Sequence, residues 1–153
     1  MFTAIKFTAS YSSVVTRAIS MGYYVSASDS LKVLHCSTLE CTASTNTVAD
    51  NTSASGQWPT IIAGNDGNPL VFFEDRNKTT LRMVKCLDVS CTTSLSKILV
   101  PGGVVGRNNV VAIRSDGTPV VLYESVDVQE LNLLSCANRS VSHAVVDTPF
   151  KRL

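Results

Sequence analysis

The chain has 153 residues, of which 44% are hydrophobic and 16% charged, and its formal net charge is +1. These proportions are typical of a folded chain with a hydrophobic core and argue against disorder. Thirteen basic and twelve acidic residues nearly cancel, so no strong field favours binding of nucleic acid or a membrane surface, and we expect neither as a partner. No apolar run approaches the ~20 residues that span a bilayer.

The N-terminal stretch 1–13 does not resemble a signal peptide. A signal peptide begins with basic residues, and an uninterrupted apolar segment follows them. Here no basic residue precedes the apolar positions, and Lys6 interrupts them. This stretch therefore gives no indication of export.

A repeat of fifty residues runs through the sequence. A set of turn, strand and cysteine residues within 58–91 recurs fifty positions later, and part of it occurs fifty positions earlier. Such a fixed period indicates tandem structural units. We therefore predict one β-repeat domain over 1–153, with repeats of about 1–50, 51–100 and 101–150. The matched residues are Asp66-Gly67 with Asp116-Gly117, Pro69 with Pro119, Phe73-Glu74 with Tyr123-Glu124, Leu81 with Leu131, Cys86 with Cys136, and Phe73, Leu81, Cys86 and Cys91 with Tyr23, Leu31, Cys36 and Cys41.

The first repeat is degenerate, so the second serves as the template. In repeat one, Thr16-Arg17 replaces the Asp-Gly dipeptide and Ile19 replaces the proline. In repeat two, residues 60–63 are apolar and β-branched and lead to Asp66-Gly67, a strong hairpin signal because glycine accepts the positive φ of a tight turn. We therefore predict a first strand at 60–63.

The next strands of repeat two are predicted from a gradient of polarity. Residues 70–73 are apolar at consecutive positions, which is typical of a strand covered on both faces, and 120–123 share this pattern. After a polar loop at 75–80, residues 81–85 mix apolar and charged positions, so we expect one side of this strand to face water. A weaker fourth strand is predicted at 92–100.

Four antiparallel strands in about fifty residues, with burial falling outward, match the size of a β-propeller blade. We therefore predict an all-β fold of three four-stranded blades. A β-sandwich is the alternative, but its strands occupy unlike environments and have no reason to repeat at a fixed spacing.

The repeated pattern Asp-Gly-x-Pro, an apolar strand, and Cys-x4-Cys resembles a family of bacterial tandem repeats associated with β-propellers. The resemblance covers nearly the whole chain and is most specific at Asp66-Gly67-x-Pro69, Asp116-Gly117-x-Pro119 and the two cysteine pairs. It implies a propeller fold and identifies no catalytic residue. Members of such families are usually exported, which fits the paired cysteines.

The five cysteines predict two disulfides. Cys36 and Cys41 share the spacing of Cys86 and Cys91, whereas Cys136 has no partner in the third repeat. Cysteines that flank a four-residue hairpin loop can face each other at a Cα separation suited to a disulfide. A zinc site is the alternative, but both pairs would have to converge on one ion. We expect two disulfides, a free thiol at Cys136, and no metal or other cofactor.

Four residues are candidates for ligand binding. Glu74 and Glu124 follow the buried strand at the same repeat position and could form a set of carboxylates near one face, although a strand that leaves the core often ends in a charge. Trp58 could stack on a sugar or fill a gap between blades, and Arg114 is expected near a blade's inner edge. His35 is expected to be solvated.

These residues leave two classes of function. The favoured one is a non-catalytic binding module for a saccharide or small polar ligand, and the alternative is a hydrolase- or lyase-like enzyme with a site in the same channel. Because known propellers have four to eight blades, three blades predict a homodimer of two half propellers.

Intact-mass measurement of the unfolded chain, with and without alkylation, tests the cysteine pairing. Under non-reducing conditions we expect alkylation of Cys136 alone, because a disulfide does not react with thiol reagents. Five alkylated thiols in an oxidised preparation would contradict both pairs.

Overall fold

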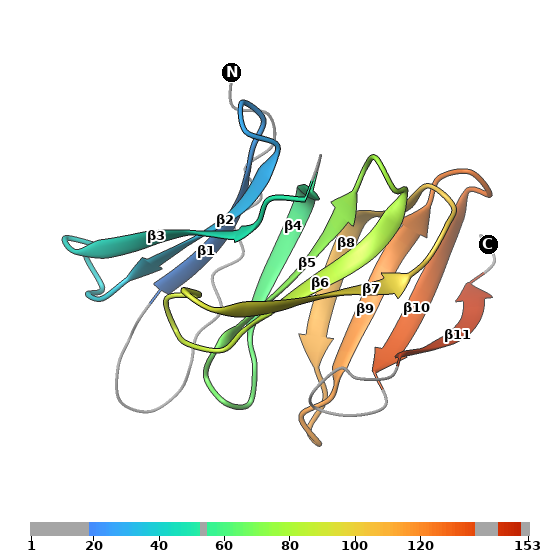
Figure 1. The fold of residues 1–153 in the computed structure, drawn as a ribbon. Coiled ribbons are helices and arrows are strands. Elements are labelled where there is room, and N and C mark those ends of the chain that lie inside the picture. Colours follow the sequence, from blue (N-terminus) through green and yellow to red (C-terminus); the bar gives the residue numbers. More distant parts are fainter. Residues whose placement is uncertain (1–18, 53–54, 137–143, 151–153) are drawn as a thin grey trace.

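The structure is a computed structural model that describes residues 19–52, 55–136 and 144–150 (Figure 1). These residues form eleven strands in three antiparallel sheets, which confirms the predicted all-β class. Among them, no helix is long and apolar enough to cross a membrane.

Each sheet is a meander in which strands adjacent in sequence pair antiparallel. Every strand of sheet 3 begins and ends fifty residues after its counterpart in sheet 2, and β1 to β3 precede β5 to β7 by the same step. Sheet 1 contains β1 (Ile19–Val25), β2 (Ser30–Cys36) and β3 (Ser44–Asp50); sheet 2 contains β4 (Ser55–Ala63), β5 (Pro69–Asp75), β6 (Thr80–Cys86) and β7 (Ser94–Val100); sheet 3 contains β8 (Val105–Ile113), β9 (Pro119–Ser125), β10 (Glu130–Cys136) and β11 (Ala144–Phe150).

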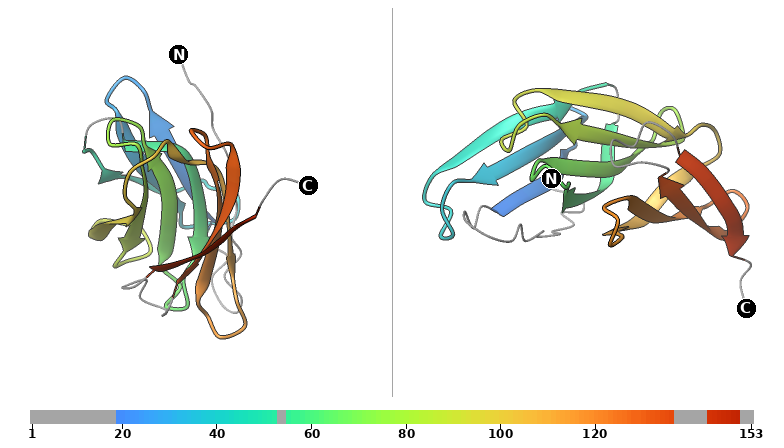
Figure 2. Two further views of the ribbon diagram at one scale, coloured as in Figure 1. Left: turned by 90° about the vertical axis from the view of Figure 1, so that its right-hand side faces the viewer. Right: turned by 90° about the horizontal axis from the view of Figure 1, so that it is seen from below.

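Sheet 2 lies between sheets 1 and 3, and both of its faces are buried (Figures 1 and 2). Side chains alternate along β5, so Leu70 and Phe72 pack toward sheet 3, while Val71 and Phe73 pack toward sheet 1. All seven residues of β5 are buried. The consecutive apolar residues of this strand therefore have the two covering layers that the sequence predicted.

Burial decreases from β5 to the outer strand β7, as the sequence predicted. On β7, Leu95 is 60% and Ile98 43% exposed. The expectation that the charged side of β6 faces water is wrong, because Arg82 is only 7% exposed. This arginine is paired with carboxylates from two sheets, which compensates for its loss of water.

The first strand of each sheet makes the contact with the preceding sheet. β4 packs on β1 and β2, and β8 packs on β4, β5 and β6. Glycines allow the close approach: a Cβ at Gly56 would lie 2.6 Å from the Cβ of Leu31, and one at Gly106 would lie 3.3 Å from the Cα of Leu81. The inner strands therefore stack at a distance that a side chain at either glycine would prevent.

We expect Gly56→Ala to destabilise the contact between sheets 1 and 2. Overpacking at such a site costs about 1–3 kcal/mol, in addition to the strain of a non-glycine residue at φ 98°. Gly67→Ala is the matched control, because Gly67 also has a positive φ but has no atom within 4 Å of its added Cβ. Urea unfolding should show a larger loss for Gly56→Ala, and equal losses would contradict the close-approach argument.

Candidate functional site at the strand bulges

The first strands of sheets 2 and 3 are interrupted at the same repeat position. The register of β4 with β5 shifts on both sides of Gln57, and that of β8 with β9 shifts on both sides of Arg107. Trp58 and Asn108 then adopt φ values of 52° and 48°, which are rare for non-glycine residues. Such bulges redirect side chains and are frequent beside functional sites. Trp58 was expected just before the first strand but lies inside it, since β4 begins at Ser55.

The bulges and the neighbouring strand ends define one group of polar and aromatic residues, which we call the bulge cluster. It lies at the end of the sheets where β4 and β8 begin and β5 and β9 end, the upper end in Figure 1. Its members are Gln57, Trp58, Glu74, Arg107, Asn108 and Glu124.

Glu74 is the most unusual residue of this cluster. It is fully buried at 0% exposure, and its Oε1 accepts a long hydrogen bond of 3.4 Å from Nε of Arg107. Its Oε2 has no hydrogen-bond partner. Burial raises the pKa of Glu74, and this effect outweighs the opposing charge of Arg107. The cluster therefore contains a buried carboxyl group with an unused oxygen, an arrangement that costs stability unless a further group satisfies it.

The repeat equivalents of Glu74 show that the cluster is not a uniform set of carboxylates. Tyr24 occupies this position in sheet 1, where its hydroxyl group donates a hydrogen bond to Asp29 and also lies next to the side chain of Gln57 from the next sheet. Glu124 occupies it in sheet 3 and accepts a hydrogen bond of 3.0 Å from Nδ2 of Asn108. Each position thus contacts a bulge residue, but with different chemistry.

Asn109 holds the two bulges together. Its Nδ2 donates to the carbonyl oxygens of Trp58, at 2.7 Å, and Gly106, at 2.9 Å. Its main-chain carbonyl oxygen accepts a hydrogen bond of 2.8 Å from the hydroxyl group of Thr60. Asn109 is fully buried, so these bonds link the first strands of sheets 2 and 3 away from solvent.

Three of the four predicted ligand-binding residues lie at this end of the sheets, and Arg114 does not. Trp58, Glu74 and Glu124 are members of the bulge cluster. Arg114 follows the opposite end of β8, where it donates to Ser135 at 2.8 Å. Arg107 was not identified from the sequence. Its position could have been found from the repeat, because Arg107 follows Gly106, and Gly56 occupies the equivalent position fifty residues earlier.

A buried ionic cluster around Arg82 joins sheets 1 and 2. Its guanidinium group lies 3.0 Å from a carboxylate oxygen of Asp50 in sheet 1 and 3.1 Å from one of Asp75 in sheet 2. Burial alone would raise the pKa of Asp50, but hydrogen bonds from Thr52 and Ser96 and the charge of Arg82 together lower it. Because the charges are paired with one another, we interpret this cluster as a structural clamp.

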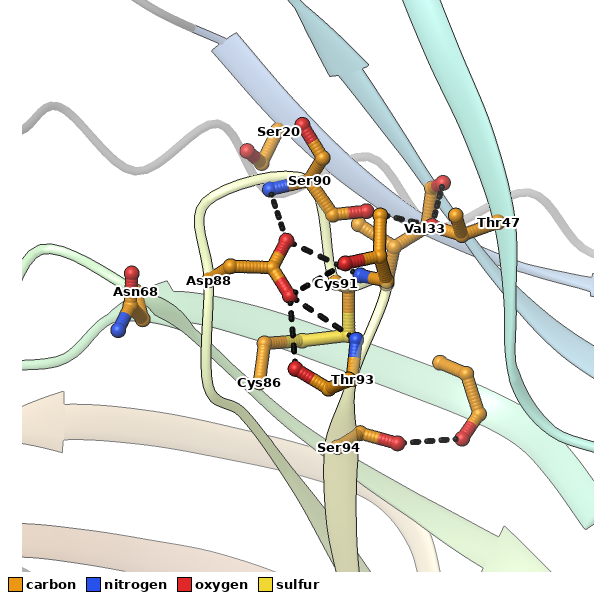
Figure 3. The surroundings of a disulfide bond; sticks show 12 residues. Ser20, Val33, Thr47, Asn68, Cys86, Asp88, Ser90, Cys91, Thr93 and Ser94 are labelled. Carbon is orange, nitrogen blue, oxygen red and sulfur yellow. Dashed lines mark hydrogen bonds between the residues drawn. A yellow bond between two sulfur atoms is a disulfide. The ribbon is translucent and has the colours of Figure 1, made fainter.

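The second disulfide closes a loop that packs against sheet 1 (Figure 3). The Cα atoms of Cys86 and Cys91 lie 4.7 Å apart, and both residues are buried in the core between sheets 1 and 2. Inside the loop, the Asp88 carboxylate accepts hydrogen bonds from the backbone of Ser90, Thr92 and Thr93 and from the hydroxyl groups of the two threonines. These bonds, led by the backbone bond from Thr92, lower the pKa of Asp88. The Asp88 carboxylate is therefore satisfied by hydrogen bonds from within the loop.

Among the described residues, the other cysteines and His35 form no further site. Cys36 and Cys41 are also joined, and burial raises the pKa of the free Cys136 thiol to about 11, so it is a poor nucleophile. His35 is buried at 9% exposure beside Ser20 and is not solvated as expected, because β2 turns it toward sheet 2. His143 lies outside the described residues. Within the described parts of the chain, no three metal-ligating side chains come together.

Comparison with known proteins assigns no family to this chain, so its class of protein is described by its fold alone. No protein-family model matches the chain, and no curated protein matches it significantly. The fold itself defines an all-β protein of stacked antiparallel sheets with disulfide-closed loops.

The raised pKa of Glu74 gives a test by pH. The folded state favours the protonated carboxyl group, so its stability falls as pH rises above the ordinary glutamate value of 4.5. Glu74→Gln removes this effect, and we expect the variant to gain stability relative to the parent between acidic and neutral pH in urea titrations. Glu124→Gln, at the half-buried equivalent position in sheet 3, is the control for removing a carboxyl group from the bulge cluster. A parent–Glu74→Gln difference that is the same at every pH would contradict the assignment.

Proposed function

We propose that this chain is a non-catalytic binding module of β-propeller type that takes a saccharide or another small polar ligand at the bulge cluster. The observation that carries the proposal is the buried Glu74 carboxyl group, whose Oε2 is unsatisfied beside two strand bulges at the same repeat position.

The propeller arrangement is supported by the way the sheets stack. Each sheet is an antiparallel meander, and the first strand of each following sheet packs on the sheet before it. In a propeller, the first strands line a central axis and the fourth strands form the outer rim. The burial of β5 and the exposure of β7 fit this direction. The resemblance to exported bacterial tandem repeats predicts the same arrangement.

The chemistry of the cluster supports a polar ligand with hydroxyl groups. A carboxyl group and an amide such as those of Glu74 and Asn108 bind hydroxyl groups as acceptor and donor. An indole ring such as that of Trp58 offers an apolar face for a sugar ring. Few, well-placed polar groups beside an aromatic side chain are typical of small-molecule sites.

Binding is favoured over catalysis by the contacts of the titratable groups. An enzyme needs such groups to converge on one reacting atom. Here Glu74 contacts Arg107 and Glu124 contacts Asn108, so the two carboxyl groups are held in separate pairs. The described histidine, His35, lies beside Ser20 of β1 and not in the cluster.

Three sheets are fewer than the four to eight blades of known propellers. A homodimer of two half propellers, with six blades, completes the ring in this proposal.

A thermal-shift screen with monosaccharides, short oligosaccharides and small charged metabolites tests the ligand site. A ligand that binds the folded state at about 100 times its Kd stabilises it by about 2.7 kcal/mol, so we expect a clear rise in Tm. Trp58→Ala and Glu74→Gln should lose most of the shift. Arg114→Ala, at the far end of β8, should retain it. A ligand whose shift survives both cluster variants, or the absence of any shift across the screen, would count against this function.

A further inference from the structure

The outward face of sheet 3 carries exposed residues whose counterparts in the other sheets are buried. We call this side, which points away from sheet 2, the trailing face. On it, Leu131 is 47% exposed, whereas Leu31 and Leu81, at the same position in sheets 1 and 2, are 0% exposed. Val110 is 55% exposed, and its counterpart Thr60 is 4% exposed. Among the described side chains, the trailing face also includes the half-buried residues Val120, Leu122 and Leu133.

Sheet 1 has a matching outward face on the opposite side of the stack, which we call the leading face. Its residues Met21, Tyr23 and Leu34 are only half-buried. Their counterparts in sheets 2 and 3 are buried at the contacts between sheets. These counterparts are Val71, Phe73 and Val84 in sheet 2, and Val121, Tyr123 and Leu134 in sheet 3.

The two contacts inside the chain show what covers such faces. Leu31 and Val33 of sheet 1 share a core with Phe73 and its neighbours, and Leu81 and Met83 of sheet 2 share a core with Tyr123 and its neighbours. In both cases a trailing face is covered by a leading face. The occupant that fits each free face is therefore the other free face of an identical chain.

We propose that two copies of this chain associate head to tail, with the trailing face of each on the leading face of the other. This inference rests on the propeller arrangement proposed above and does not depend on the ligand. A two-fold axis relates the two contacts, so the assembly closes and leaves neither face exposed.

Light scattering from low to high micromolar concentration tests this association with three aspartate variants. Leu131→Asp places a charge on the trailing face, and Met21→Asp places one on the leading face. Leu95→Asp is the matched control, because Leu95 is 60% exposed on the outer strand β7 and belongs to neither face. An unpaired charge in an interface costs several kcal/mol, so each face variant should raise the dimer Kd by about a hundredfold.

We expect a dimer for the parent and for Leu95→Asp, and a monomer for both face variants. A stable monomer of the parent over the whole range would overturn the proposal, as would open polymers of increasing length. Dissociation by Leu131→Asp but not Met21→Asp would also overturn it, since it would indicate contact between two trailing faces. Circular dichroism checks the fold of each variant, with Leu131→Ser and Met21→Ser replacing any aspartate variant that does not fold.

Discussion

The burial of both faces of sheet 2 is the constraint on which the rest of the structure depends. Phe72 and Phe73 are adjacent in β5 and point to opposite sides, yet both are 0% exposed. Burying one such side chain contributes about 1.5–3 kcal/mol, so sheet 2 requires a neighbour on each side. Sheets 1 and 3 meet this requirement, and the chain therefore forms a stack and not an isolated sheet.

The close stacking also determines where polar chemistry is located. Gly56 and Gly106 bring the first strands against the preceding sheets, and the bulges that follow place Gln57 and Arg107 against the ends of β1 and β5. Charged side chains also lie in the contacts between sheets. At one contact Arg82 is paired with two aspartates, while at the next Glu74 has only a long bond to Arg107. The second arrangement leaves Oε2 of Glu74 without a hydrogen-bond partner.

The sequence by itself determined the class of fold and the period of the chain. Consecutive apolar residues required β5 to be covered on both sides, Asp66-Gly67 specified a turn, and the Cys-x4-Cys spacing brought each pair of cysteines within reach. These features are local, because they depend on alternation, on positive φ and on short loops. They could be predicted without knowing which sheets touch.

Only the tertiary structure decided the surroundings of individual side chains. The surroundings of Arg82 and His35 differ from expectation because burial depends on the neighbouring sheet and not only on the strand that carries the residue. Arg82 is buried because Asp50, from another sheet, lies opposite it. The contact between Glu74 and Arg107 joins residues 33 positions apart through the stacking of two sheets. A pattern along one strand cannot specify such a contact, because its energy comes from the packing between sheets.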